Sequence, residues 1–165
     1  MDKIQFHYGD LTDHQSIMEI VRNVRPDWVF NLGAQSQVGI SYANPMYTME
    51  ATGVGACNLM ECVFNVNPQA RFYQASSSEM WGETGITMMG SMDEAYPLNP
   101  ISPYAVAKVM AHNYALMKRR QGFHAVIGIL NNHESEWRGD NFVTTKVVKK
   151  AAARQKVTLG YPARS

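Results

Sequence analysis

Short apolar runs and longer amphipathic segments alternate along this chain. Short runs rich in β-branched and aromatic residues predict strands at Ile4–Tyr8, Trp28–Leu32, Arg71–Ala75 and Ala125–Leu130. Segments with apolar residues three or four positions apart predict helices from the capping residue Asp13 to about Val24, from Pro45 to Val66, from Ser102 to Gln121 and from about Phe142 to Arg154. Val157–Leu159 is a candidate start for one further strand.

This order of elements predicts an α/β fold. Strands joined by helices form a parallel sheet through right-handed crossovers, with helices on both faces of the sheet. Ligands of such sheets bind beyond the carboxyl ends of the strands. Polar groups follow the predicted strands at those ends, at Asp10, Gln35-Ser36, Ser76–Glu79 and Asn132–Ser135. We therefore expect a single domain, residues 1–165, that carries its chemistry at one edge of the sheet.

The helix that starts at Ser102 places Tyr104 and Lys108 one turn apart on the same face. A nearby ammonium stabilises a phenolate, so a tyrosine with a reference pKa of about 10 can act as a base near neutral pH. Such a pair suits the oxidation of an alcohol, in which a nicotinamide accepts the hydride. The alternative is an exposed helix with a lysine stem lying along its surface.

The loop after the third predicted strand carries Ser76, Ser77, Ser78 and Glu79. These groups could simply satisfy backbone donors in a turn, with Glu79 as a capping residue. The loop precedes the Tyr104–Lys108 helix by one unit of the cycle, however, so its hydroxyl and carboxylate groups are expected to face the same cleft.

Several motifs share the order and approximate spacing of one enzyme family. They are Asp10-Leu11, Leu32–Ser36, Tyr47, the Gln-Ala-Ser-Ser-Ser-Glu loop ending at Glu79, Ser102–Lys108, Asn132–Ser135 and Phe142–Thr144. On these residues the chain, from about Phe6 to Lys146, resembles the GDP-mannose 4,6-dehydratases of the extended short-chain dehydrogenase/reductase superfamily. Tyr-x-x-x-Lys is typical of the whole superfamily, whereas the Ser-Glu loop together with Asn-His-Glu-Ser favours this family over sugar epimerases and reductases.

The resemblance implies a role for each matching residue. The implied catalytic groups are Ser77 in place of a threonine, Glu79 as acid/base, Tyr104 as the base for the alcohol and Lys108 as its helper. The implied cofactor-binding residues are Asp10, Leu11, Leu32, Gly33, Ala34, Gln35, Ser36, Tyr47, Lys108, His133 and Arg138. The implied substrate-binding residues are Asn132, Val143 and Lys146. The implied ligands are NADP, with NAD not excluded, and GDP-mannose or a related nucleotide-sugar.

The resemblance also implies a partial Rossmann-like fold. Such a doubly wound parallel sheet would lack its first two strands here, because no Gly-x-x-Gly-x-x-Gly turn follows a strand near the N-terminus. We expect a chain truncated at both ends relative to the family. The strand at Ile4–Tyr8 would then be unpaired, re-paired or completed by another chain.

Composition narrows the class of protein. Fifteen Lys and Arg residues against fourteen Asp and Glu give a net charge of +1, which favours neither nucleic acid nor a membrane surface as a partner. Cys57 and Cys62 suit buried thiols, and the histidines outside the motifs have no spacing that indicates a metal site. Without a targeting pattern or a long apolar run, we expect a cytoplasmic protein, and the resemblance suggests a homo-oligomer.

Two classes of function follow. The first is a GDP-mannose 4,6-dehydratase-like lyase that forms a 4-keto-6-deoxy sugar through a tightly held nicotinamide cofactor. The second is a catalytically silent module that binds a nucleotide-sugar or a partner subunit, which the missing glycine turn favours. A related epimerase or reductase is a third hypothesis, against which Ser77 and Glu79 argue.

Overall fold

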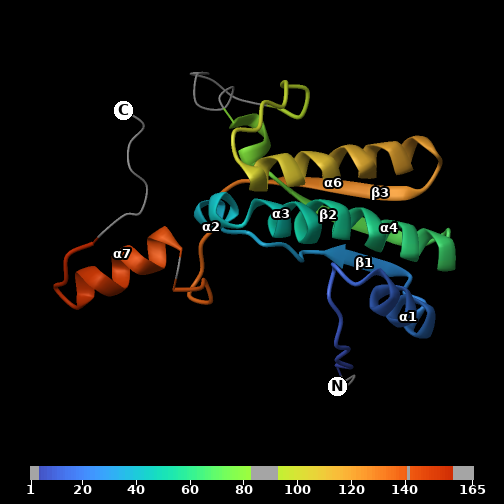
Figure 1. Ribbon diagram of the computed structural model, residues 1–165, viewed down its shortest axis with the longest axis horizontal. Coiled ribbons are helices and arrows are strands. Elements are labelled where there is room, and N and C mark those ends of the chain that lie inside the picture. The colour runs from blue at the N-terminus through green and yellow to red at the C-terminus, as the bar shows by residue number, and fades with distance from the viewer. Residues whose placement is uncertain (1–3, 83–92, 141, 158–165) are drawn as a thin grey trace. The chain divides into compact units, whose positions relative to one another are not determined.

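The computed structural model describes residues 4–82, 93–140 and 142–157, in two compact units (Figure 1). The first unit is Met1–Leu130 and the second is Asn131–Ser165. The elements of the first unit are α1 (His14–Val24), β1 (Trp28–Asn31), α2 (Val38–Ala43), α3 (Pro45–Thr48), η1 (Met49–Val54), α4 (Gly55–Val66), β2 (Arg71–Ser77), η2 (Ser78–Trp81), α6 (Pro103–Arg120) and β3 (His124–Leu130). The second unit contains α7 (Val143–Ala152).

The three strands form a parallel sheet in the order β1-β2-β3. Trp28 lies opposite Arg71, which lies opposite His124, so the strands start level. β2 continues beyond the end of β1 to Ser77, which pairs with Leu130. The predicted α/β class and parallel sheet are therefore confirmed.

Local signals in the sequence mark where helices α1 and α6 begin or end, as the sequence predicts. Asp13 caps α1, and its carboxylate accepts hydrogen bonds from the backbone amides of Gln15 and Ser16, each at 3.1 Å. Arg25 ends α1 in the left-handed conformation with φ 48°. After α6, Gly122 has φ 93°, a conformation that favours glycine.

The predicted helix from Pro45 to Val66 is present, but it changes its winding along its length. α3 runs into the π-helical turn η1, which runs into α4 without a break. η1 packs against α6, and Gly53 eases the close approach because a Cβ there would lie only 3.0 Å from the Met110 Sδ and 3.4 Å from the Ala107 Cα. The short helix α2 was not predicted. It has only six residues, and no side chain caps its first turn.

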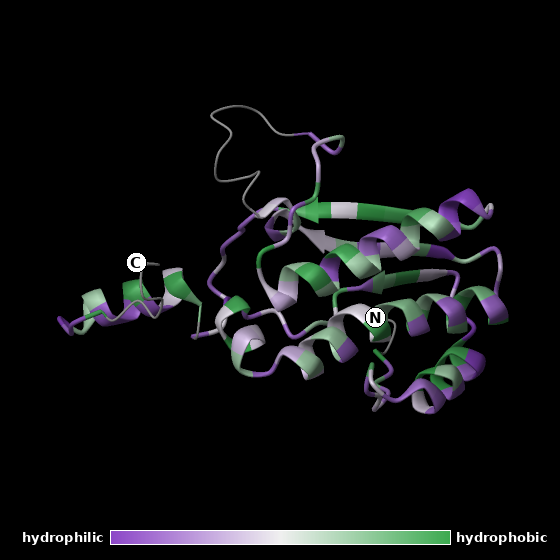
Figure 2. Ribbon diagram, turned by 45° about the horizontal axis from the view of Figure 1, so that its top comes forward, coloured by the Kyte–Doolittle hydropathy of each residue, from purple (hydrophilic) through white to green (hydrophobic). Residues whose placement is uncertain are grey.

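One face of the sheet forms the core with α1, α4 and α6. The buried side chains of this core are Ile17, Val21, Met60, Cys62, Val63, Phe64, Ala70, Phe72, Ala115 and Ala125. Phe64 stacks on Phe123 with ring centres 4.5 Å apart. Cys62 is buried and Cys57 is half-buried, and both are free thiols, as predicted. Figure 2 shows β3 as an almost continuously hydrophobic strand, which is typical of parallel sheets.

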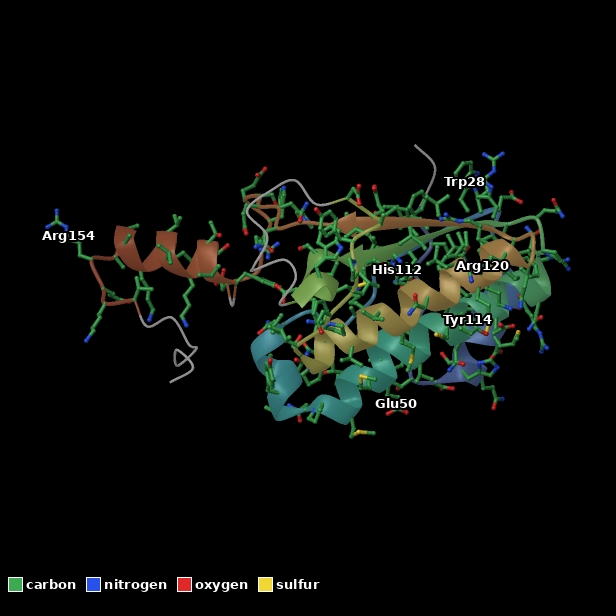
Figure 3. All side chains as sticks on the ribbon, turned by 90° about the horizontal axis from the view of Figure 1, so that it is seen from above. Trp28, Glu50, His112, Tyr114, Arg120 and Arg154 are labelled. Atoms are coloured by element: carbon green, nitrogen blue, oxygen red, sulfur yellow. The ribbon has the colours of Figure 1, made fainter. Side chains whose placement is uncertain are left out.

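The opposite face of the sheet is exposed in the described part of this unit. Trp28 and Phe30 on β1 are 58% and 63% exposed, and Val126 on β3 is 45% exposed. In Figure 3 Trp28 lies on the side of the sheet opposite to the helix that carries His112 and Tyr114. Helices on both faces were expected, whereas the described helices of the first unit lie on one.

The predicted strand at Ile4–Tyr8 is wrong. These residues form no strand, and Ile4, Phe6 and Tyr8 are highly exposed, at 79%, 84% and 101%. A strand needs a neighbour that satisfies its backbone groups, and no described strand lies beyond β1 to pair with this segment. Of the candidate strand Val157–Leu159, the last two residues lie outside the described residues. No helix among the described residues is long and apolar enough to cross a membrane.

Gly55 should be intolerant of a side chain. A Cβ at Gly55 would lie 2.7 Å from the Leu11 carbonyl oxygen and 2.8 Å from the Leu11 Cβ, so the backbone would have to move. We expect Gly55→Ala to lower the free energy of unfolding by about 1–3 kcal/mol in urea denaturation. Gly39→Ala in α2 is the matched control, because a Cβ there meets nothing within 4 Å. Equal effects of the two changes would contradict the prediction.

Glu61 should make folding sensitive to acid. Burial alone would raise the pKa of Glu61, but hydrogen bonds from Lys118 and Tyr114 outweigh burial and hold the pKa below its ordinary value. A carboxyl group with a lowered folded-state pKa stabilises the protein above its ordinary pKa of 4.5, and this stabilisation is lost as pH falls through the folded-state value. We expect Glu61→Gln to cost about 1–2 kcal/mol at pH 7 and much less near pH 3, as measured by denaturation at both pH values. A cost independent of pH would contradict this role.

Candidate active site

Ser77 stands at the carboxyl end of β2, the central strand of the sheet. Its side chain is buried, and its Oγ accepts a hydrogen bond of 3.2 Å from the Glu79 backbone amide, which starts the turn η2. The strand-to-turn transition therefore fixes the hydroxyl and directs the chain toward Glu79. Glu79 itself is exposed.

Tyr104 lies in the first turn of α6, because Ser102 caps that helix. The Ser102 Oγ accepts a hydrogen bond of 3.1 Å from the Ala105 amide, and Pro103 occupies the first helical turn, where its missing N–H is tolerated. Tyr104 is only 8% exposed, and the Ser77 side chain lies close enough to its phenol to lower its pKa. The structure thus brings together two residues that are far apart in the sequence.

Lys108 lies one turn further along α6 and is 4% exposed. Its Nζ is 5.7 Å from the centre of the Tyr104 ring and donates a hydrogen bond of 2.9 Å to the Ala75 carbonyl oxygen on β2. Burial lowers the pKa of Lys108 to about 8. The ammonium is therefore held between the tyrosine and the central strand. Its pKa of about 8 is close to neutral pH, so it loses its proton more readily than an exposed lysine does.

The environment of Tyr104 works against the phenolate in the observed arrangement. Burial raises the pKa of Tyr104, the hydrogen bond with Ser77 lowers it, and the charge of Glu79 raises it further. The spacing of Tyr104 and Lys108 predicts that the neighbouring ammonium lowers this pKa, but the net direction is upward because burial is the largest effect. The carboxylate of Glu79 is therefore close enough for its charge to act on the Tyr104 phenol.

The loop from Leu32 to Ser36 follows β1 at the same edge of the sheet. The Gly33 amide donates a hydrogen bond of 3.2 Å to Asn31 Oδ1. Gln35 is held on two sides, since its amide donates to Thr52 Oγ1 at 3.0 Å and its Nε2 donates to Thr48 Oγ1 at 3.1 Å. Two buried threonines of α3 and η1 therefore fix the middle of this loop.

Three other predicted cofactor residues lie around that loop or near the N-terminus. Asp10 is exposed, and hydrogen bonds from the amide and hydroxyl of Thr12, both 2.9 Å, lower its pKa. Leu11 packs beneath Gly33, where a Cβ would lie 2.7 Å from the Leu11 Cδ1. Tyr47, on α3, is 53% exposed.

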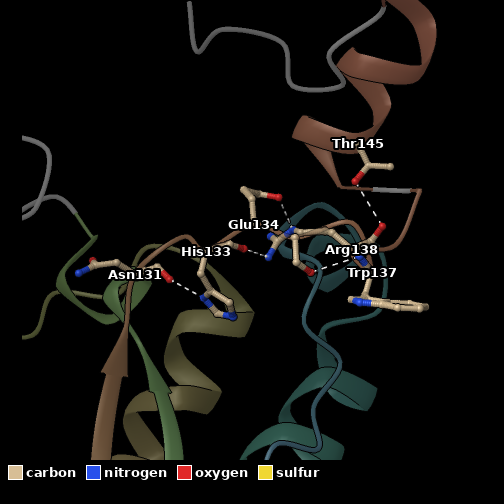
Figure 4. A network of polar contacts seen from close by, with 7 residues as sticks. Asn131, His133, Glu134, Trp137, Arg138 and Thr145 are labelled. Carbon is tan, nitrogen blue, oxygen red and sulfur yellow. Dashed lines mark hydrogen bonds and ion pairs between the residues drawn. The ribbon is translucent and has the colours of Figure 1, made fainter. Parts of the chain in front are cut away.

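The remaining predicted residues belong to the second unit (Figure 4). Arg138 organises this unit: its Nη1 donates a hydrogen bond of 2.7 Å to the His133 carbonyl oxygen, and its Nε forms an ion pair of 3.1 Å with Glu134. The guanidinium also lies 4.2 Å from the centre of the Phe142 ring. Asn132 and Val143 are exposed and Lys146 is partly buried.

Four buried polar residues were not predicted as part of the site. Asn31 and Gln74 lie inside the sheet, and Thr48 and Thr52 support Gln35. A carboxamide within each of two apolar strand segments was the available signal, because such groups are rarely buried without a defined set of hydrogen bonds.

The donors at this edge fit a nicotinamide dinucleotide. The described hydrogen bond of Lys108 uses one of the three N–H donors of its ammonium, which leaves donors suited to sugar hydroxyl groups. Ser76 Oγ is also buried with no hydrogen-bond partner among the described residues. No group of three or more His, Cys, Asp or Glu in the described part of the chain could hold a metal ion.

Solved structures similar to this chain share its fold. DesIV, a dTDP-glucose 4,6-dehydratase from Streptomyces venezuelae solved with NAD and TYD bound, superposes with a TM-score of 0.78 at 24% identity, over 88% of this chain and 44% of DesIV. RMD from Pseudomonas aeruginosa, solved with NADPH, also has a TM-score of 0.78 at 24% identity, over 90% of this chain and 50% of RMD. This chain therefore has the Rossmann-like fold of these two proteins.

Comparison of sequences gives the family. The GDP-mannose 4,6-dehydratase of Vibrio cholerae serotype O1 is 41% identical over 148 residues, which are 88% of this chain and 39% of that protein. GDP-mannose 4,6 dehydratase 1 of Arabidopsis thaliana is 42% identical over 161 residues, 94% of this chain and 43% of that protein. This chain thus spans about two fifths of the length of these relatives. Because the family model described as GDP-mannose 4,6 dehydratase matches residues 1–161, the chain belongs to the GDP-mannose 4,6-dehydratase family.

Proposed function

We propose that the protein to which this chain belongs is an NADP-dependent lyase that converts GDP-mannose to GDP-4-keto-6-deoxymannose. The observation that carries this proposal is the contact of Ser77 with Tyr104, with Lys108 behind the tyrosine and Glu79 two residues from the serine. An alcohol oxidation needs only the serine, tyrosine and lysine. A carboxylate beside them supplies what an elimination needs in addition.

Each group has a defined task in this reaction. Tyr104 accepts the proton of the sugar C4 hydroxyl through its phenolic oxygen. A bound nicotinamide cofactor supplies hydride acceptance from C4 and hydride return to C6. The C4 ketone makes the C5 proton acidic, so Glu79 can remove it and, with Ser77, pass a proton to the C6 hydroxyl, which departs as water. When C6 receives the hydride, C5 takes up one proton, which balances the proton that Tyr104 accepted from the C4 hydroxyl.

Lys108 has two tasks in this scheme. Its ammonium lies 5.7 Å from the centre of the Tyr104 ring, where its charge would favour the phenolate over the neutral phenol, and its remaining donors would hold the cofactor ribose. Gly33 and the loop around Gln35 would lie along the cofactor, and Asn132, Val143 and Lys146 would contact the nucleotide-sugar. A homo-oligomer in the cytoplasm is the setting that we propose for it.

The direct test is to incubate the purified protein with GDP-mannose and NADP or NAD and to look for a 4-keto-6-deoxy sugar by mass spectrometry. Product formation with NADP in preference to NAD would support the proposal in full. Binding of GDP-mannose without conversion under these conditions would favour the silent module instead.

Glu79→Gln should block elimination while leaving binding intact. We expect product formation to fall about 10²–10⁴-fold, because the amide cannot take the C5 proton, with little change in the affinity for GDP-mannose by calorimetry. The matched control is Glu19→Gln, an exposed carboxylate on α1, which should leave activity unchanged. Full activity in Glu79→Gln would exclude the proposed acid/base role.

Lys108→Met should make the protein more stable and less active. The pKa of Lys108 is lower in the folded protein than its ordinary value of 10.5, so burial of the ammonium weakens folding below about pH 8, and this effect fades as pH rises from 8 toward 10.5. The difference corresponds to on the order of 3 kcal/mol, part of which the hydrogen bond to Ala75 offsets. We therefore expect Lys108→Met to raise the free energy of unfolding at pH 7 by about 1–3 kcal/mol while product formation is lost. A loss of stability at pH 7 would show that Lys108 is a structural residue.

A further inference from the structure

Two carboxamide side chains are buried next to each other inside the sheet. Asn31, the last residue of β1, is 3% exposed, and its register partner Gln74 on β2 is 1% exposed. Both lie on the face of the sheet that packs against the helices. Burying a carboxamide is unfavourable unless its hydrogen bonds are made, and two apolar side chains of similar shape could fill the same space without that requirement. The fold alone therefore does not explain this pair.

The pair belongs to a continuous chain of hydrogen bonds. The Gly33 amide donates to Asn31 Oδ1 at 3.2 Å, and Asn31 Nδ2 donates to Gln74 Oε1 at 2.9 Å. Gln74 Nε2 then donates to the Ala75 carbonyl oxygen at 3.0 Å. Each carboxamide accepts one hydrogen bond with its oxygen and donates one with its nitrogen, so neither polar atom of either side chain is left without a partner.

The chain of hydrogen bonds ends at the acceptor of Lys108. The Ala75 carbonyl oxygen also receives the hydrogen bond of 2.9 Å from Lys108 Nζ, so Gln74 and Lys108 occupy its two lone pairs. Gln74 thereby fixes the direction of the one carbonyl group that is described as holding the buried ammonium. At its other end, this chain of hydrogen bonds holds the Gly33 amide in the loop that follows β1.

We infer that Asn31 and Gln74 are positioning residues, a carboxamide relay that holds the Lys108 ammonium and the Gly33 backbone in one fixed geometry at the active site. Neither side chain needs to touch the substrate for this role. The catalytic consequence rests on the proposed function, whereas the hold on Lys108 follows from the hydrogen bonds themselves. An ammonium displaced by a fraction of an ångström would stabilise the Tyr104 phenolate less well, because small errors of position are costly in catalysis.

Gln74→Met tests the relay with little change of volume. The thioether cannot donate to Ala75 or accept a full hydrogen bond from Asn31, so the relay is cut at its centre. Asn31→Leu cuts it one step earlier, between Gly33 and Gln74. The control is Asn67→Ala, which also removes a carboxamide that joins two segments: Asn67 Nδ2 donates to the Pro26 carbonyl oxygen at 3.1 Å, at the amino ends of the strands.

The first measurement requires no catalysis. Competitive labelling of amines with acetic anhydride, read by mass spectrometry, gives the reactivity of Lys108 relative to the exposed Lys156 in the same molecule. We expect Gln74→Met and Asn31→Leu to raise the relative reactivity of Lys108 about fivefold or more, because a less firmly held ammonium reaches the reagent more often. In Asn67→Ala the ratio should stay within about twofold of the parent protein at a similar midpoint of thermal unfolding.

The second measurement is kinetic. In the proposed dehydration, Gln74→Met should lower kcat about tenfold and shift the pH at which activity rises to higher values, with the KM for GDP-mannose changed less than about twofold. Unchanged Lys108 reactivity in Gln74→Met, or an equal rise in Asn67→Ala, would overturn the relay whatever the activity. A parent protein without dehydratase activity but with the expected labelling pattern would reject the proposed function and leave the hold on Lys108 supported.

Discussion

A buried ammonium joins the two elements on which the candidate site depends. Lys108 comes from α6 and its acceptor, the Ala75 carbonyl oxygen, comes from the central strand β2. A buried positive charge is unfavourable unless hydrogen bonds or opposite charges compensate for the lost water. The lowered pKa of Lys108 reflects this cost of desolvation. The position of α6 along the sheet, and with it the position of Tyr104, is therefore coupled to this buried polar contact between helix and strand.

Small residues allow that contact to form. Ala105, Ala107, Ala111 and Ala115 are buried on α6, so the helix can approach the sheet and η1 closely. Gly53 in the π-helical turn adds to this closeness by facing Ala107. The same turn directs Thr52 toward Gln35 in the loop after β1. The altered winding of η1 therefore serves both the packing of α6 and the shape of the loop, in keeping with the frequent occurrence of π-helical turns near functional sites.

The polar groups of the site and the apolar core occupy the same face of the sheet in succession. Phe72 and Ala125 begin that face and pack against α4 and α6, whereas Gln74 and Ser76 continue it toward the carboxyl ends of the strands. Every second residue of β2 points to this face, so the face changes from apolar core at Phe72 to polar side chains at Gln74 and Ser76 within four residues. On the other face of the sheet the side chains of Trp28, Phe30 and Val126 are exposed to solvent, so the described helices stabilise the sheet from one side.

The sequence by itself determined the α/β class, most elements and the family. Asp13, Pro45, Ser102 and Gly122 mark helix ends through local chemistry, and the spacing of Tyr104 and Lys108 follows from helical geometry alone. Only the tertiary structure decided whether Ile4–Tyr8 pairs as a strand, because pairing depends on a neighbour and not on composition. It alone also revealed the raised pKa of Tyr104 and the link from Gly33 through Asn31 and Gln74 to Lys108, since burial and cross-strand hydrogen bonds arise from residues distant in sequence.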